Sequence, residues 1–136
     1  MGTRTRVVLD ASAVVRAVID WSTDARSWLD AVDQGAADAF APDLIYAEIS
    51  NSLVRYVRAG RSSAHEVVRV LGAVAELPIE TRPTKALFGV AYGLATVRGV
   101  SAYDAHYLVL AEAEDAVLVT ADRALAAAAT KSVLLE

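Results

Sequence analysis

Short apolar runs alternate with longer segments of helical period along this chain. Three runs end in Asp or in a turn, and two weaker ones complete a set of five. Short strands that alternate with helix-length segments form βα units, so the pattern predicts an α/β fold with a mainly parallel sheet covered on both faces. The five runs cover residues 6–10, 38–42, 77–81, 116–122 and 132–136.

The segments between these runs carry helix start and stop signals. Ser63 and Glu66 form a capping-box pattern that predicts a helix start. Gly60 and Gly99 stand where helices that precede them need a left-handed stop. Helices are therefore predicted over 11–19, from about 44 to 59, from 64 onward, over 87–98, over 101–114 and from 123 onward.

Length and composition narrow the class of protein. The chain of 136 residues is sufficient for one domain with its own core, so we predict a single domain over 1–136. No stretch approaches the ~20 apolar residues that cross a bilayer, and Asp10 interrupts the apolar segment that a signal peptide would need. We therefore expect a cytoplasmic protein with no membrane contact. Because the chain has no cysteine, carboxylates, two histidines and hydroxyls are the available chemistry.

The charge of the chain limits how it could meet nucleic acid. A formal net charge of −4 argues against a protein that coats nucleic acid by charge alone, because that mode needs a broadly basic surface. Local basic patches stay possible. Arginine dominates the basic residues, and its planar fork suits bidentate contacts to phosphate or carboxylate.

Two acidic residues follow predicted strands. Asp10 ends the first run and Asp122 ends the fourth. Each one can be explained as the N-cap of the helix that follows it. In an open parallel sheet, however, the carboxyl ends of the strands form the edge at which ligands bind.

Two further acids lie within predicted helices. Asp104 falls three residues after Ser101, which fits a capping box, yet it shares a helical stripe with apolar residues. Glu48 lies on or beside an apolar helix face, where an unpaired charge is costly. An ion pair with Arg55, two turns along the helix, is the alternative explanation for Glu48.

Taken together, the four acids predict a cation site. Two carboxylates about 5 Å apart repel by about 3 kcal/mol at an effective dielectric constant of 20, so four of them favour protonation or a bound cation. Oxygen donors select Mg²⁺ or Mn²⁺, ions that act on phosphate groups. Ser12 and Thr120 lie two residues from Asp10 and Asp122 and are interpreted as groups that orient a carboxylate or a water, or else as turn hydroxyls. The two histidines are interpreted as structural.

The same stretches resemble a known family. VVLDASAVV, LIYAEISNSL, SAYDAHYLVLAE and LVTADRAL occur in this order over nearly the whole chain. With them, the chain resembles the PIN-domain ribonucleases, in particular the VapC toxins of type II toxin-antitoxin pairs. The resemblance implies a three-layer α/β/α fold with a central five-stranded parallel sheet.

The resemblance also implies an activity and partners. It implies a metal-dependent endoribonuclease in which a metal-activated water hydrolyses RNA and leaves 5′-phosphate and 3′-hydroxyl ends. It implies Mg²⁺ or Mn²⁺ as cofactor, a VapB-type antitoxin that blocks the cleft, and a homodimer. The catalytic and metal-binding residues that it implies are Asp10, Glu48, Asp104 and Asp122, with Ser12, Thr120 and Asn51 as polar support around them.

Basic and aromatic residues give candidate contacts. Arg16, Arg55, Arg58 and Arg123 are candidate RNA contacts, with solvated helix faces as the alternative. Trp21 and Trp28 flank a predicted helix, and the core is the favoured place for them, Trp28 in particular; a dimer or antitoxin surface is the alternative.

Two other functions compete with the ribonuclease. A phosphohydrolase could work through an aspartyl phosphate on Asp10, but that chemistry normally uses an acid two residues later, where Ser12 stands, and a lysine in the cleft. A non-catalytic α/β domain could bind a partner while its acids only cap helices and pair with arginine.

Overall fold

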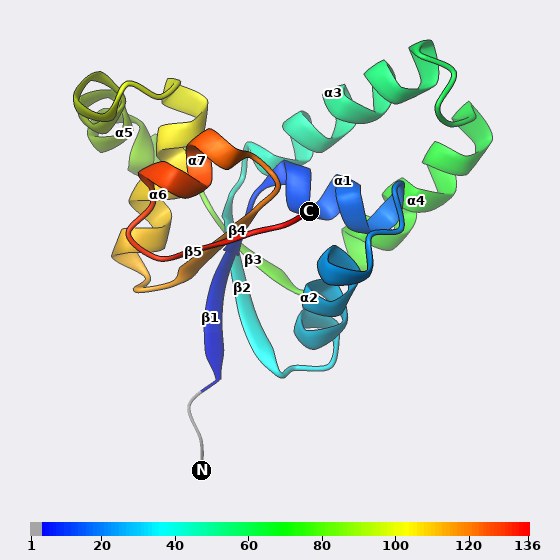
Figure 1. Cartoon of the computed structure of the whole chain (residues 1–136), viewed down its shortest axis with the longest axis horizontal. Coiled ribbons are helices and arrows are strands. Elements are labelled where there is room, and N and C mark those ends of the chain that lie inside the picture. The colour runs from blue at the N-terminus through cyan, green and yellow to red at the C-terminus, as the bar shows by residue number, and fades with distance from the viewer. Residues whose placement is uncertain (1–3) are drawn as a thin grey trace.

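The chain folds around a five-stranded parallel sheet with strand order β3-β2-β1-β4-β5 (Figure 1). The computed structural model describes residues 4–136, so residues 1–3 of the predicted domain lie outside it. All five predicted strands are present, and the predicted parallel α/β fold is confirmed. The strands are β1 (Thr5–Leu9), β2 (Ala37–Pro42), β3 (Ile79–Arg82), β4 (Val117–Thr120) and β5 (Ser132–Leu134).

Helices cover both faces of this sheet and make three layers. In Figure 1, α1 to α4 lie on one side of the strands and α5 to α7 on the other. None of the helices formed by the described residues has the length and apolar character that crossing a bilayer requires. The helices are α1 (Ala11–Val18), α2 (Thr23–Asp33), α3 (Ile45–Arg58), α4 (Ala64–Glu76), α5 (Thr84–Arg98), α6 (Ala102–Ala113) and α7 (Arg123–Ala128).

The order of the strands creates a crevice at the carboxyl ends of β1 and β4. From β1 the chain steps outward to β2 and β3, then returns across the sheet to β4 and steps outward again to β5. Because parallel crossovers are right-handed, the two directions place their helices on opposite faces. Ligands of open α/β sheets bind where the direction changes, which here is between β1 and β4.

Side-chain caps set most helix boundaries as predicted. The hydroxyls of Ser63 and Ser101 accept from the backbone N–H three residues later and begin α4 and α6. Gly99, with φ of 69°, ends α5 in the left-handed conformation. That helix begins earlier than its apolar period indicated, at Thr84, whose N–H donates to Asp43 Oδ1 at 3.0 Å. A cap supplied by a residue so distant in sequence leaves no local signal.

The core is built from small and branched residues around the central strand. Val7, Val8 and Leu9 of β1 are fully buried because helices pack on both faces of this strand. Neighbouring β2 contributes alanines at alternate positions, and their small size permits α1 and α2 to approach the sheet. The predicted burial of Trp28 is confirmed in part, since it is half-buried and packs against this core.

A half-buried ion cluster joins β1 and β3 to the end of α6. Glu114, just after α6, accepts hydrogen bonds from Arg6 of β1 and from Arg82 of β3. The two guanidinium groups lie 4.6 and 5.3 Å from the ring centroid of Phe40 on the strand between them. The Glu114 side chain is only 17% exposed, whereas those of Arg6 and Arg82 are 39% and 33% exposed, so its removal leaves two guanidinium groups that water reaches in part.

We predict that Glu114→Ala lowers the free energy of unfolding by about 1 to 3 kcal/mol, because two cations lose a shared half-buried acceptor. Urea unfolding followed by circular dichroism measures the change. Glu112→Ala is the matched control, since Glu112 pairs with Arg98 at a more exposed position and should cost less than about 1 kcal/mol. Equal losses for the two variants would contradict the assigned role of Glu114.

Candidate active site

Asp10 stands at the end of β1 and caps α1. Its Oδ1 accepts from the N–H of Ala13 at 3.0 Å, so the capping interpretation holds for this residue. Capping does not explain its burial, because only 6% of Asp10 is exposed. A carboxylate removed from water needs further donors to its oxygens.

Two hydroxyls supply those donors. Ser12 Oγ donates to Asp10 Oδ1 at 2.7 Å, and Thr120 Oγ1 donates to Asp10 Oδ2 at 2.6 Å. Each hydroxyl oxygen also accepts a backbone N–H, Ser12 from Ala121 at 2.9 Å and Thr120 from Asp122 at 3.0 Å. Since these oxygens are already acceptors, their protons point at Asp10. The hydrogen bonds expected from Ser12 and Thr120 are therefore present, and they tie the end of β1 to the end of β4.

Asp122 follows β4 and faces solvent beside this network. Its Oδ1 accepts from the N–H of Leu125 at 3.1 Å and caps α7. Because β1 and β4 are neighbours in the sheet, the two strand-end acids share one edge. The capping role found for both Asp10 and Asp122 thus coexists with their meeting at the crevice.

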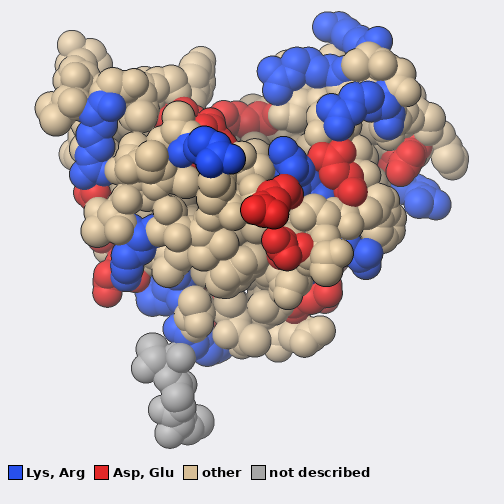
Figure 2. Space-filling view, in the orientation of Figure 1, with Lys and Arg blue, Asp and Glu red and all other residues tan. Residues whose placement is uncertain are grey.

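Glu48 and Asp104 reach the same crevice from helices on opposite sides. Glu48 lies in the first turn of α3 and Asp104 in the first turn of α6, and both are half-buried. Figure 2 shows acidic surface at the bottom of the notch between α3 and the α5–α6 side of the molecule. One cavity of about 280 Å³ contains all four acids, and its lining residues are Asp10, Ala11, Ser12, Glu48, Asn51, Ser52, Arg55, Asp104, Tyr107 and Asp122.

Tyr107 is the residue of this site whose role the sequence did not reveal. Its buried hydroxyl donates to Glu48 Oε1 at 2.7 Å and connects α6 to α3 across the cavity. Arg55 instead donates to Ser52 Oγ at 3.3 Å, and no ion pair joins it to Glu48 in the described part of the chain. The alternative explanation of Glu48 as a partner of Arg55 is therefore wrong. Tyr107 belongs to the same apolar helical stripe as Asp104, which indicates a buried side chain. The sequence near Tyr107 contains no signal that identifies Glu48 as the acceptor of its hydroxyl.

Burial, together with neighbouring negative charge, raises the pKa of three of these acids and makes them harder to ionise. Burial is the largest cause of the raised pKa of Asp10. The three hydrogen bonds to its carboxylate lower the pKa, and the negative charge of Asp122 raises it. Burial also raises the pKa of Glu48, with smaller contributions from Asp104 and Asp10. The pKa of Asp104 is raised by burial and by Asp122. Across residues 4–136 no basic side chain lies within 4.0 Å of any of the four acids.

Comparison with known proteins identifies the family. The family model described as PIN domain matches residues 7–131. The chain belongs to the PIN domain family. Ribonuclease VapC9 of Mycobacterium tuberculosis is 33% identical over 116 residues, which are 85% of each chain. The predicted resemblance to PIN-domain VapC ribonucleases is thus confirmed.

Solved structures agree on the fold of this PIN domain. PAE2754 from Pyrobaculum aerophilum superposes with a TM-score of 0.75 at 25% identity, covering 96% of this chain and 91% of that one. VapBC2 from Rickettsia felis, solved bound to a DNA fragment from their promoter, gives a TM-score of 0.67 at 14% identity over 97% and 100%. The five-stranded PIN-like architecture expected from the sequence is confirmed.

The donor set of the PIN domain fits a hard cation. Every acidic group in the cavity offers oxygen, the ligand that Mg²⁺ and Mn²⁺ prefer, and no ion pair within residues 4–136 neutralises any of the four acids. Within residues 4–136 no three acidic or histidine side chains form a complete metal-ligand group. Mg²⁺ usually keeps several waters and takes only one or two protein carboxylates.

The other predicted site residues divide between two hollows. Asn51 and Arg55 line the acidic cavity from α3, and Arg58 lies one turn further along that helix, exposed. Arg16 and Arg123 line a separate hollow of about 380 Å³ beside the carboxyl end of β4. The structure thus brings one of the four candidate arginines into the acidic cavity.

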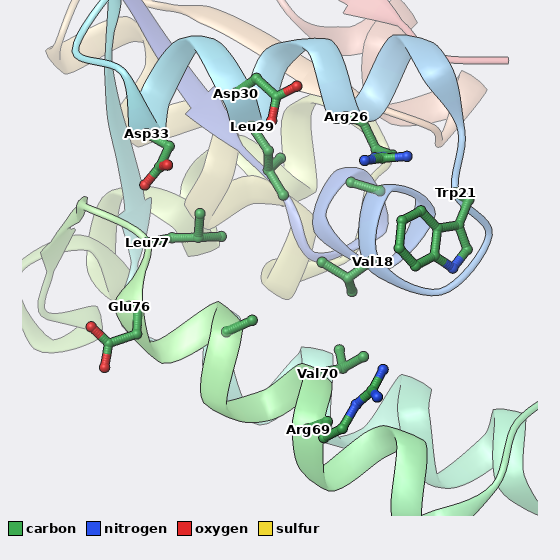
Figure 3. A pocket seen from close by; sticks show the side chains of 12 residues that line it. Val18, Trp21, Arg26, Leu29, Asp30, Asp33, Arg69, Val70, Glu76 and Leu77 are labelled. Carbon is green, nitrogen blue, oxygen red and sulfur yellow. The ribbon is translucent and has the colours of Figure 1, made fainter.

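The histidines and the first tryptophan lie outside the cavity. His106 Nδ1 is 2.6 Å from the carbonyl oxygen of Ala102, one turn back in α6, which agrees with a structural role. The core position favoured for Trp21 is wrong, since its side chain is 59% exposed. Figure 3 shows Trp21 at the edge of a cavity of about 590 Å³ between α2 and α4, and Arg26 is stacked on its ring. None of the four acids lines that cavity.

We predict that Asp104→Asn raises the melting temperature of the metal-free protein. In the folded chain the pKa of Asp104 lies above its unfolded value, so its ionised form is destabilising at neutral pH and the penalty fades as pH falls through the raised pKa. Scanning calorimetry in EDTA at pH 7 and at pH 5 should show an advantage of the variant that narrows at the lower pH. Asp115→Asn is the opposite control, because Lys131 lowers the pKa of Asp115. A lower melting temperature for Asp104→Asn at pH 7 would contradict the charge cluster.

We predict that Tyr107→Phe raises the pKa of Glu48 further, because the hydroxyl that stabilises its ionised form is gone. Carboxyl chemical shifts of ¹³C-labelled glutamate, followed through a pH titration without metal, measure the change. Tyr103→Phe, one turn earlier in α6 and exposed, is the control and should leave the titration of Glu48 unaltered. An unchanged Glu48 in Tyr107→Phe would show that the hydrogen bond does not hold this carboxylate in solution.

Proposed function

We propose that this PIN domain, spanning residues 1–136, is a metal-dependent endoribonuclease that hydrolyses phosphodiester bonds of RNA. The observation that carries the proposal is that four carboxylates from distant parts of the sequence line one small cavity without a basic partner within 4.0 Å in the described chain. Membership of the PIN family and the likeness to Ribonuclease VapC9 support it. The proposed catalytic and metal-binding residues are Asp10, Glu48, Asp104 and Asp122.

The residues of the cavity divide the work. Mg²⁺ or Mn²⁺, held by these carboxylates, would supply positive charge for the phosphate and lower the pKa of a water nucleophile. Ser12 and Thr120 hold Asp10 in one orientation through hydrogen bonds to both of its oxygens. Tyr107 occupies Glu48 Oε1, which leaves Oε2 to accept a proton from the attacking water. As the water oxygen bonds to phosphorus, the bond to the 3′ oxygen breaks and that oxygen takes up a proton.

We further infer a toxin role with a VapB-type antitoxin as partner and a homodimer as the free form. The inference rests on relatives named VapC and on the likeness of fold to VapBC2. RNA as substrate fits a cytoplasmic location. Growth arrest on expression of the chain, relieved by the product of a neighbouring reading frame, tests the partner, and sedimentation of the pure chain tests the dimer.

The competing functions explain less of the site. Aspartyl-phosphate chemistry on Asp10 normally uses an acid two residues later, but Ser12 stands there and donates to Asp10 Oδ1. Neither Lys85 nor Lys131 lines the acidic cavity. A non-catalytic function is consistent with the helix caps made by Asp10 and Asp122. It does not explain why Glu48 lies opposite these two acids.

We predict that Asp10→Asn and Asp122→Asn each reduce RNA cleavage by ~10²-fold or more, because each removes a negatively charged oxygen ligand that the proposed metal ion needs. Cleavage of a labelled RNA in Mg²⁺ measures this, circular dichroism verifies the fold, and EDTA should abolish the wild-type activity. Asp24→Asn, in the exposed first turn of α2, is the control for loss of one acid. Undiminished cleavage by both site variants would refute the assignment.

A further inference from the structure

The two walls of the acidic cleft differ in chemistry. Figure 2 shows basic side chains gathered over the outer part of α3 and the turn into α4, beside the acidic notch. The opposite wall is formed by α6, which contributes Asp104 and Tyr107 to the cavity lining and carries the 67% exposed Tyr103 in its first turn. A strand of nucleic acid carries both a charged backbone and flat bases, and these two walls match its two parts.

Arginines on α3 form a line that leads out of the cavity. A helix rises ~1.5 Å per residue and turns ~100°, so Arg55 lies ~10 Å from Glu48 along the same side, and Arg58 lies ~5 Å beyond it. Arg55 lines the cavity, and neither arginine has an acidic partner within 4.0 Å in residues 4–136. The next arginine, Arg61, already forms an ion pair with Asp20 and stacks on Tyr56, so we do not include it among the phosphate contacts.

Tyr103 stands at the mouth of the cleft on the other wall. It lies one turn N-terminal to Tyr107 on the same side of α6, and Tyr107 points across the cavity to Glu48. The ring of Tyr103 is exposed, and no hydrogen bond of its hydroxyl is found within the described chain. An exposed ring beside a phosphate-binding cleft is a platform on which an unstacked base can lie.

We propose that a single-stranded RNA segment crosses this cleft with its backbone phosphates on Arg55 and Arg58 and one base stacked on Tyr103. The proposal rests on the ribonuclease function proposed above and names the residues that position its substrate. The arginines offset the repulsion between the four acids and the RNA backbone, which a chain of net charge −4 cannot offset globally. Stacking on Tyr103 selects single strands, because bases within a duplex are not free to leave their neighbours.

Binding of a fluorescein-labelled single-stranded RNA 12-mer, followed by anisotropy in EDTA so that the RNA stays intact, tests the proposal. Arg55→Ala and Arg58→Ala should each weaken binding several-fold and reduce the slope of log K against log salt by about 0.7, the value for one phosphate contact on a single strand. Tyr103→Ala should weaken binding by about 5-fold or more with no change of slope, and Tyr103→Phe should retain it.

Matched controls exist for both groups. Arg69→Ala removes an exposed arginine of α4 that lines the cavity of Figure 3, and Tyr92→Ala removes an equally exposed ring of α5. Neither control should alter RNA binding as the cleft variants do. Cleft variants that behave like these controls would overturn the proposal, as would an RNA duplex of the same sequence that binds equally well and depends equally on Tyr103.

The wild-type protein separates this proposal from the one on which it rests. Cleavage of the same RNA in Mg²⁺ by the wild type, together with cleft variants that bind like the controls, would refute the strand path and leave the ribonuclease standing. Absence of cleavage in Mg²⁺ and Mn²⁺, together with the predicted losses of binding, would refute the ribonuclease and leave a single-strand binding cleft.

Discussion

The buried carboxylate of Asp10 is the constraint on which the rest of the site depends. Its charge is removed from water at the centre of the molecule, and only two hydroxyls and one backbone amide compensate for that. Those donors come from α1 and from the end of β4, so the carboxylate is satisfied only when the two central strands are paired in register. The same bonds that stabilise this charge therefore assemble the floor of the cavity.

The half-buried charges around Glu114 are arranged differently. Glu114 lies between Arg6 and Arg82, and each half-buried group there has a partner of opposite sign. In the acidic cavity the reverse holds, since burial and neighbouring acids raise the pKa of Asp10, Glu48 and Asp104. A fold that pairs its charges elsewhere but leaves these like charges together retains a site that favours a cation at some cost in stability.

The PIN architecture explains why these acids meet. The chain runs outward from β1 to β3 and then back across the sheet from β3 to β4. Because α3 belongs to the outward path and α6 to the return path, the two helices approach the crevice from opposite faces, and each brings one carboxylate. The same arrangement makes the two walls different, since α3 contributes Arg55 to the cavity lining and α6 contributes Tyr107. The proposed catalytic residues and the proposed substrate contacts thus share one edge of the sheet.

The sequence by itself determined the strands, most helix starts and the identity of the acidic residues. Each of those features has a signal in the nearby sequence. Apolar runs indicate the strands, Ser63 and Ser101 indicate helix starts, and Asp10 and Asp122 come directly after strands. Such signals act within one helical turn or one strand, so their meaning does not depend on distant parts of the chain.

Only the tertiary structure decided which distant groups touch. Tyr107 and Glu48 are 59 positions apart, and their hydrogen bond exists because α6 and α3 flank the same crevice. The start of α5 at Thr84 depends on Asp43, 41 positions away, and Trp21 is exposed at the edge of the cavity between α2 and α4. No periodicity within one segment encodes these contacts, because each is set by the packing of one element against another.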